Sequence, residues 1–386
     1  MKIANRINKI PPYPFVQISR TIAQKKSEGI DVISFGIGDP DIPTPDTVIE
    51  SLTKGSLKNI NHRYPESEGL PEFRLGVANW YSKRFGIELN PDNEIISLIG
   101  AKEGIGHISL ALLNPDDIAL IPDPGYPVYS IGTLFAAGQD YIMPLLKKNN
   151  WLPDLTEIPE EIARKAKVMW LNYPNNPTGA IVQDSYLNDV VEFAKKYDIT
   201  ILHDACYTEI YYDNYLPKSF LNIPRAKDVG IEFHSLSKSY NMTGWRIGMA
   251  VGNSEIIKAL EIVKSNLDSG APQAIQEMAL AALSLDQEYI ETRNAIYENR
   301  RNKIVETLNN IGLYVDPPKA SLYIWAEVPE GYSSKDFSEQ LLEECNVLVS
   351  PGTSYGKYGE GFVRLSLTLS DDKIDEALTR IAKWKQ

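Results

Sequence analysis

The stretch IEFHSLSKSYNMTGWRIG, residues 231–248, decides the fold class of this chain. It opens with a short strand-like run, and polar residues follow at once. Two earlier segments, NYPNNPTG (172–179) and HDACY (203–207), also come directly after strand-like runs. Because open α/β sheets bind ligands at the carboxyl ends of their parallel strands, the three segments are predicted to meet in one crevice.

The sequence on either side of these segments alternates between short apolar runs and amphipathic stretches. Strands are predicted at 94–99, 117–121, 168–171, 199–202, 231–233 and 247–251. Helices are predicted at 103–113, 184–197 and 254–266. This alternation predicts an α/β fold with a mostly parallel, helix-flanked sheet.

The two ends of the chain have a different character. At the N-terminus, an extended Pro-rich arm, PPYPF (11–15), leads into a helix predicted from about Val16 and a strand at 31–35. The last third predicts one long helical run, 274–311, followed by strands and a closing helix in a smaller α+β domain. The late strands are predicted near 322–327 and 361–367. The predicted domains are an N-terminal arm with part of the small domain at 1–40, a large domain that contains the sheet at 41–280 and a small domain at 281–386.

Composition excludes several classes of function. The 386 residues include 39 Lys and Arg against 51 Asp and Glu, a net charge of -12, without a basic run, so nucleic acid and anionic membranes are poor partners. Two cysteines, Cys206 and Cys345, are too few for a disulfide framework and suit a reducing compartment. Because neither a signal peptide nor a membrane-length apolar run is evident, we expect a cytoplasmic protein. The four histidines do not form a metal-binding spacing, so no metal is predicted.

Each motif residue has an ordinary explanation when it is taken alone. An aspartate after a strand often caps a helix, NPTG is a plausible turn, and most lysines are solvated. GIG at 36–38 could open a dinucleotide-binding loop, but Asp39-Pro40 breaks the helix that such a loop requires, and neither GxGxxG nor GxxxxGK[ST] occurs. This argues against a nicotinamide-dependent oxidoreductase.

Taken together, the motifs resemble the class I/II aminotransferases, which are pyridoxal-phosphate-dependent enzymes of fold type I. The resemblance covers essentially the whole chain. Beyond the three segments above, it rests on PPYPF, GIGDPDIPTP (36–45), HRYPESEG (62–69), PDPGYPVY (122–129) and KSNLDSG (264–270). It implies pyridoxal 5'-phosphate as cofactor, small amino-acid and 2-oxo-acid substrates, and a homodimer with active sites at the subunit interface.

The resemblance also assigns roles to individual residues. Lys238 would hold the cofactor covalently and then move a proton, while Asp204 would pair with the protonated ring nitrogen. Tyr207 and Asn176 would bond the phenolic oxygen of the ring, and Tyr126 would stack on its face. The implied catalytic residues are therefore Lys238, Asp204 and Tyr207.

The phosphate and the substrate have implied partners of their own. Backbone groups at the start of a helix, hydroxyls and a guanidinium would bind the phosphate, together with Tyr64 of the partner subunit. These residues within the chain are Ala101, Lys102, Ser235, Ser237 and Arg246. Arg364 would grip the substrate carboxylate, which Gly38 would also approach. The other implied substrate contacts are Tyr13, Lys102, Tyr126 and Asn176. The ordinary alternatives are an interface or core aromatic for Tyr64 and a lobe-stabilising salt bridge for Arg364.

The resemblance is closest to family members that act on LL-diaminopimelate. It implies transfer of an amino group between glutamate/2-oxoglutarate and tetrahydrodipicolinate/LL-2,6-diaminopimelate, in lysine and peptidoglycan precursor biosynthesis, by a ping-pong cycle. The acidic loop 66–68, and Ser269 of the partner subunit, are further candidates for the distal end of that substrate. Departures from the common pattern at Ala101, SLYIW (321–325) and SYGKYG (354–359) leave other aminotransferase specificities and a β-lyase open. A non-catalytic pyridoxal-binding regulator is the alternative from another class.

Overall fold

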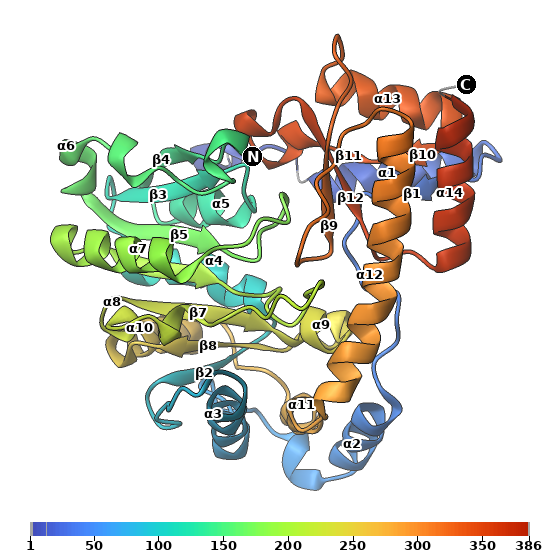
Figure 1. Cartoon of the computed structure of the whole chain (residues 1–386). Helices are drawn as coiled ribbons and strands as arrows, with labels where there is room; N and C mark the ends of the chain where they lie inside the picture. The colour runs from blue at the N-terminus through green and yellow to red at the C-terminus, as the bar shows by residue number, and fades with distance from the viewer. Residues whose placement is uncertain (1–2, 13, 385–386) are drawn as a thin grey trace.

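The computed structural model describes residues 3–12 and 14–384, and its centre is a seven-stranded sheet (Figure 1). The strand order is β2-β8-β7-β6-β5-β3-β4. Only β8 runs against its neighbours, and the other pairs are parallel. The strands are β2 (Ile95–Leu98), β3 (Ile118–Asp123), β4 (Gln139–Pro144), β5 (Ala166–Asn172), β6 (Thr200–Asp204), β7 (Gly230–Ser235) and β8 (Gly248–Gly252). The predicted α/β class with a mostly parallel sheet is confirmed.

Helices cover both faces of this sheet. They include α3 (Pro71–Phe85), α4 (Ala101–Leu112), α5 (Val128–Phe135), α7 (Asp184–Tyr197), α10 (Ser254–Leu267) and α11 (Gln273–Leu283), while α2 (Asp46–Ser56) packs on α11. Successive residues of β5 point into two separate cores, with Trp170 in the core beneath α4, α5 and α10, and Leu171 in the core beneath α3, α7 and α11. This alternation explains why the central strands are apolar on both sides.

The C-terminal part forms a second, smaller layer. Its antiparallel sheet has the order β11-β12-β9, with β9 (Tyr323–Glu327), β11 (Ser350–Pro351) and β12 (Phe362–Ser366). The helices α12 (Gln287–Asn310), α13 (Ser334–Cys345) and α14 (Asp371–Trp384) surround it (Figure 1). Near the N-terminus, β1 (Ile33–Ser34) pairs in parallel with β10 (Val347–Leu348). A segment near the N-terminus therefore pairs with one in the C-terminal part, while the division into domains stays a prediction.

The structure differs from the prediction in three places. The single run 274–311 is two helices, α11 and α12, because the chain breaks at 284–286. The edge strand β4 went unpredicted because its first residues, Gln139 and Asp140, are exposed and polar. The arm is not wholly extended: a 3-10 turn spans Asn5–Lys9, and α1 (Pro14–Ser27) begins within PPYPF, since proline is well tolerated in a first helical turn.

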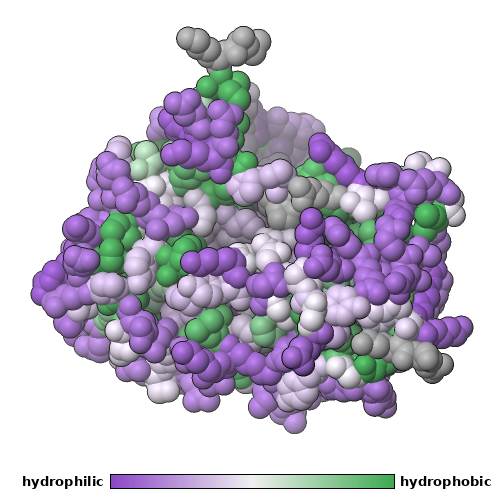
Figure 2. Space-filling model, turned by 90° about the horizontal axis from the view of Figure 1, so that it is seen from above, coloured by the Kyte–Doolittle hydropathy of each residue, from purple (hydrophilic) through white to green (hydrophobic). Residues whose placement is uncertain are grey.

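Among the residues that the structure describes, the surface seen from above carries no extended apolar face. Figure 2 shows a mostly hydrophilic surface there, with apolar residues in small separate groups. Across residues 3–12 and 14–384, none of the helices combines the length and the apolar character needed to cross a bilayer.

A buried polar cluster supports the sheet at Glu232 of β7, whose side chain is fully buried. One carboxylate oxygen accepts from His203 Nδ1 at 2.9 Å and from the Phe220 N–H at 2.7 Å, and the other accepts from the Tyr81 hydroxyl at 3.1 Å. Burial alone would raise the pKa of Glu232, but hydrogen bonds and charge from His203 and His234 hold that pKa well below its usual range. Glu232 is therefore ionised in the folded protein.

Replacing Glu232 with glutamine is expected to lower the free energy of unfolding at pH 7 by about 3 kcal/mol, because a buried charge network loses its centre. Since the folded-state pKa of Glu232 is depressed, its stabilisation is fully present above the unfolded value of about 4.3. It is lost progressively as pH falls from that value through the folded-state pKa, which lies well below it. Urea unfolding of wild type and Glu232→Gln between pH 7 and pH 3 measures both effects. The difference in free energy of unfolding between the two proteins should shrink toward pH 3. The surface variant Glu160→Gln, in a largely exposed pair with Arg164, is the control. Equal losses in both variants would contradict this account.

Candidate active site

A cavity of about 260 Å³ lies at the carboxyl ends of β6 and β7, where the three motif segments meet. Many of the predicted site residues line it: Gly38, Ala101, Lys102, Tyr126, Asn176, Asp204, Tyr207, Ser235, Ser237, Lys238 and Arg246. These residues come from loops far apart in the sequence, which the sheet brings to one edge. Their chemical roles stay predictions.

Lys238 lies on α9 (Leu236–Ser239), the single helical turn after β7. Its Nζ donates to the Gly38 carbonyl at 2.6 Å, so the amine points into the cavity toward the GIGDPD loop. The turn is anchored from α12 by Arg293, which is 2% exposed and donates to the Ser239 carbonyl and, at 3.4 Å, to the Lys238 carbonyl. A buried guanidinium therefore fixes the backbone that carries the amine.

Asp204 ends strand β6 and is 4% exposed. Its Oδ2 accepts from the Tyr129 hydroxyl at 2.7 Å, and its Oδ1 accepts from the Cys206 N–H at 3.2 Å. Burial and the neighbouring carboxylate raise the pKa of Tyr129 well above its usual range, so the phenol keeps its proton and donates. Both oxygens of the Asp204 carboxylate therefore accept a hydrogen bond. Such a carboxylate can hold a proton on a ring nitrogen placed beside it.

The opposite end of the cavity collects donors suited to an anion. Gly100, with φ +74°, precedes α4, and an added Cβ there would collide with the guanidinium of Arg246. Glycine therefore lets Arg246 lie against the start of the helix. Arg246 Nη1 also donates to Ser237 Oγ at 3.3 Å and to the Thr243 carbonyl at 2.7 Å. Helix N–H groups, hydroxyls and a guanidinium together form a set that fits a phosphate.

Arg364 does not line the cavity wall. The side chain, on β12, is fully buried, and its Nη1 donates to Asn176 Oδ1 while its Nη2 donates to the Gly36 carbonyl, both at 2.8 Å. Both acceptors are uncharged. Asn176 and Tyr323, which do line the cavity, stand next to the guanidinium. The predicted grip of Arg364 on a substrate carboxylate stays a prediction that requires Asn176 to share or yield its position.

One further predicted residue, Tyr64, lies outside the cavity of this chain. Tyr64 is 88% exposed and does not line it. The segment around Tyr64 is braced by the 268–270 loop, because Gly270 packs against the backbone of Glu66 and Ser67. An exposed tyrosine on a braced loop can reach a neighbouring subunit, which stays a prediction. Tyr13 lies outside the described residues.

The cavity also contains residues that the sequence did not single out as site residues. They are Ile37, Asp39, Ile105, Cys206, Thr243 and Tyr323. Burial raises the pKa of the Cys206 thiol, which therefore stays protonated. Tyr129, which lies behind Asp204, also went unpredicted although it closes the motif PDPGYPVY. Its position three residues after Tyr126, near the start of a helix, was the available signal.

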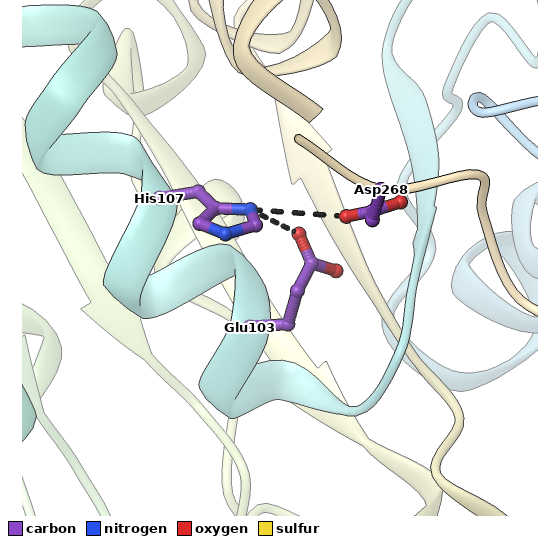
Figure 3. Close-up of side chains that lie close together, drawn as sticks. All are labelled: Glu103, His107 and Asp268. Carbon is purple, nitrogen blue, oxygen red and sulfur yellow. Dashed lines mark hydrogen bonds and ion pairs between the residues drawn. The ribbon is translucent and has the colours of Figure 1, made fainter. Parts of the chain in front are cut away.

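A cluster beside the anion end joins α4 to α10 (Figure 3). His107 Nδ1 lies 2.7 Å from Glu103 Oε1 and 3.9 Å from Asp268 Oδ2, a grouping compatible with metal ligation. The fully buried Lys264 ammonium, however, bonds Glu103 at 3.2 Å and Asp268 at 2.8 Å. Since this ammonium already pairs with both carboxylates, the cluster is explained as structural. It ties the helix at the anion end to the 268–270 loop.

Comparisons with known proteins agree with this geometry. A family model described as aminotransferase class I and II matches residues 30–381. A protein of Dehalococcoides mccartyi named LL-diaminopimelate aminotransferase is 56% identical, with 100% of each chain covered. One of the same name from Moorella thermoacetica is 51% identical over 99% of this chain and 98% of that protein. The solved structure of substrate-bound BacF from Bacillus subtilis matches with a TM-score of 0.96 and 36% identity, over 100% of this chain and 98% of that one.

Proposed function

We propose, from the premise that this chain belongs to the class I and II aminotransferase family, that it transfers an amino group between glutamate and tetrahydrodipicolinate to give LL-2,6-diaminopimelate and 2-oxoglutarate. The proposed substrate rests on sequence identity. This chain is 51% and 56% identical, over nearly its whole length, to proteins named LL-diaminopimelate aminotransferase. Such a reaction supplies a precursor of lysine and of peptidoglycan. One cavity would serve both amino acids in turn in a ping-pong cycle.

Pyridoxal 5'-phosphate is the proposed cofactor, and the residues present fit it. The helix start at Ala101 and the Arg246 guanidinium suit its phosphate, and Ser235 and Ser237 add hydroxyls. Asp204 suits its ring nitrogen, and Tyr126, which lines the same cavity, would stack its ring on that of the cofactor. When bound, pyridoxal phosphate supplies a carbonyl carbon that exchanges amines and a ring that accepts electrons.

The residues of the chain would divide the remaining work. Lys238 would attach the cofactor through Nζ and, once released, take a proton from the substrate α-carbon and return it on the cofactor side. Its 2.6 Å bond to the Gly38 carbonyl keeps the amine on the cavity side of that loop. Asp204 would hold the ring proton in place, and Tyr207 with Asn176 would donate to the phenolic oxygen. Arg364 and the Gly38 backbone would orient the substrate through the carboxylate next to its reacting α-carbon.

The distal end of the substrate requires contacts that a smaller amino acid does not need. We propose Tyr13 and Lys102 for its carboxylate side and the acidic loop 66–68 for its ammonium, with Ser269 of the partner subunit nearby. The proposed assembly is a homodimer in which Tyr64 of the partner subunit completes the phosphate site. The large exposure of Tyr64 in a single chain, 88%, supports this arrangement.

The proposed function is tested by glutamate formation from 2-oxoglutarate with a panel of amino donors. The purified holoenzyme is supplied with LL-diaminopimelate, aspartate, phenylalanine, leucine or cysteine, and both glutamate and released ammonia are measured. Glutamate formation chiefly with LL-diaminopimelate is expected. Preference for another donor would replace the substrate, release of ammonia from cysteine would indicate a β-lyase, and absence of turnover with every donor would contradict an enzyme of this class.

A further inference from the structure

Tyr323 stands at the junction of the groups to which the proposed function assigns chemistry. It begins β9, is 3% exposed, and lines the cavity. Its hydroxyl oxygen lies 3.0 Å from that of Tyr207, within hydrogen-bond distance, and the two rings meet edge to face at 5.4 Å between centroids. An added Cβ on Gly38 would collide with the same hydroxyl. The Tyr323 oxygen is therefore held between Tyr207 and the loop that accepts from Lys238.

A positive charge lies over the ring of Tyr323. The guanidinium carbon of Arg364 is 4.0 Å from the ring centroid, and Tyr355 flanks the same guanidinium with 4.7 Å to its own centroid. A cation over a phenol ring draws electron density from the ring and its oxygen. The hydroxyl of Tyr323 is thus polarised as a donor. Tyr207, the loop at Gly38 and Arg364 together limit its movement.

Either phenol could donate in the bond between the two hydroxyls, and its direction follows from what Tyr207 does with its own proton. Burial raises the pKa of Tyr207 well above its usual range, so Tyr207 is neutral and has one proton to donate. If that proton points into the cavity toward a ligand oxygen, the proton between the two hydroxyls must come from Tyr323. Consecutive O–H···O bonds polarise one another, so the first strengthens the second.

We propose that Tyr323 is a positioning residue whose hydroxyl donates to the Tyr207 oxygen and thereby aims and strengthens the donation of Tyr207 to the phenolic oxygen of the cofactor. This inference rests on the proposed cofactor. A donor to the phenolic oxygen favours the form in which that oxygen carries negative charge. The nitrogen that joins Lys238 to the bound cofactor should consequently lose its proton at a lower pH when both tyrosines are present.

The test is a pH titration of the visible absorbance of the holoenzyme in wild type, Tyr323→Phe, Tyr207→Phe and the double variant. Phenylalanine at 323 removes the hydroxyl and keeps the ring beneath Arg364. We expect the absorbance midpoint to rise by about 0.5 pH unit in Tyr323→Phe, as one hydrogen bond in a chain is lost. With Tyr207 already replaced, the second substitution should not shift the midpoint further.

Tyr355→Phe is the matched control, because it removes a phenol hydroxyl on the other ring beside Arg364. Its midpoint should equal that of wild type. An unchanged midpoint in Tyr323→Phe, or an equal shift with and without the Tyr207 hydroxyl, would overturn the role of Tyr323 alone. A wild-type holoprotein that lacks a pyridoxal absorbance band would instead overturn the proposed cofactor and this role with it.

Discussion

Replacement of Lys238 by alanine is expected to abolish amino-group transfer and to leave the protein folded. The amine would serve twice, as the covalent anchor of the cofactor and as the base that moves the substrate proton. Loss of a positioned base alone typically costs about 10²- to 10⁴-fold in rate, so losing both roles should lower kcat by roughly 10⁴-fold or more. Steady-state turnover with LL-diaminopimelate and 2-oxoglutarate measures the loss directly.

A second readout separates attachment from turnover. Borohydride reduction of the wild-type holoenzyme should leave a stable cofactor adduct on the peptide that contains Lys238, and the variant should carry no adduct there. The control is Lys227→Ala, which removes a lysine that is 41% exposed and pairs with Glu94 on the surface, and which should keep both turnover and adduct. Retained transamination in Lys238→Ala, or an adduct at another lysine, would contradict the assignment.

Replacement of Arg364 is expected to weaken binding of both substrates more than it slows the chemistry. A bidentate, charge-assisted pair with a carboxylate contributes about 2 to 4 kcal/mol, so KM for the amino acid and for the oxo acid should rise roughly 30- to 1000-fold in Arg364→Ala. Arg364→Lys keeps the charge and loses the planar fork, and it should fall between alanine and wild type. Saturation curves for both substrates provide the measurement.

Stability must be followed in the same variants because Arg364 is fully buried and bonded to Asn176 and Gly36. A purely structural role predicts a lower Tm for both variants with KM values close to wild type. The carboxylate role predicts raised KM values even in Arg364→Lys, where the buried charge is kept. Unchanged saturation curves for both substrates would exclude contact with the carboxylate.

Elements with strong local signals could be predicted from the sequence. The amphipathic pattern of α7 predicted both of its ends, Asp184 and Tyr197. The buried strands β5, β6 and β7 were predicted because each is an apolar run followed by a polar motif. The break at 284–286 between α11 and α12 was missed, because the helical periodicity resumes on its far side. The edge strand β4 was missed because half of it faces solvent and lacks the apolar run that marks a buried strand.

The candidate site, like the fold, could be predicted from the sequence only in part. Lys238, Asp204 and Tyr207 lie in motifs that follow predicted strands, so the topology of the sheet brings them together. The partners that support them come from distant parts of the chain, such as Arg293 behind Lys238 and Tyr323 beside Tyr207. Local periodicity contains no information about such pairs. The placement of Arg364 behind Asn176 likewise depends on how the two sheets pack and could not be read from the strand on which it lies.

The measurement that tests the central claim most directly is the first half of the reaction, followed in a stopped-flow instrument as loss of the visible absorbance of the holoenzyme. LL-diaminopimelate, meso-diaminopimelate, lysine, aspartate and glutamate are each added without an oxo acid. The account predicts rapid loss with the LL isomer and with glutamate, and little with the others, because the site must accept those two amino acids in turn. Rapid loss with aspartate or lysine and none with LL-diaminopimelate would contradict it.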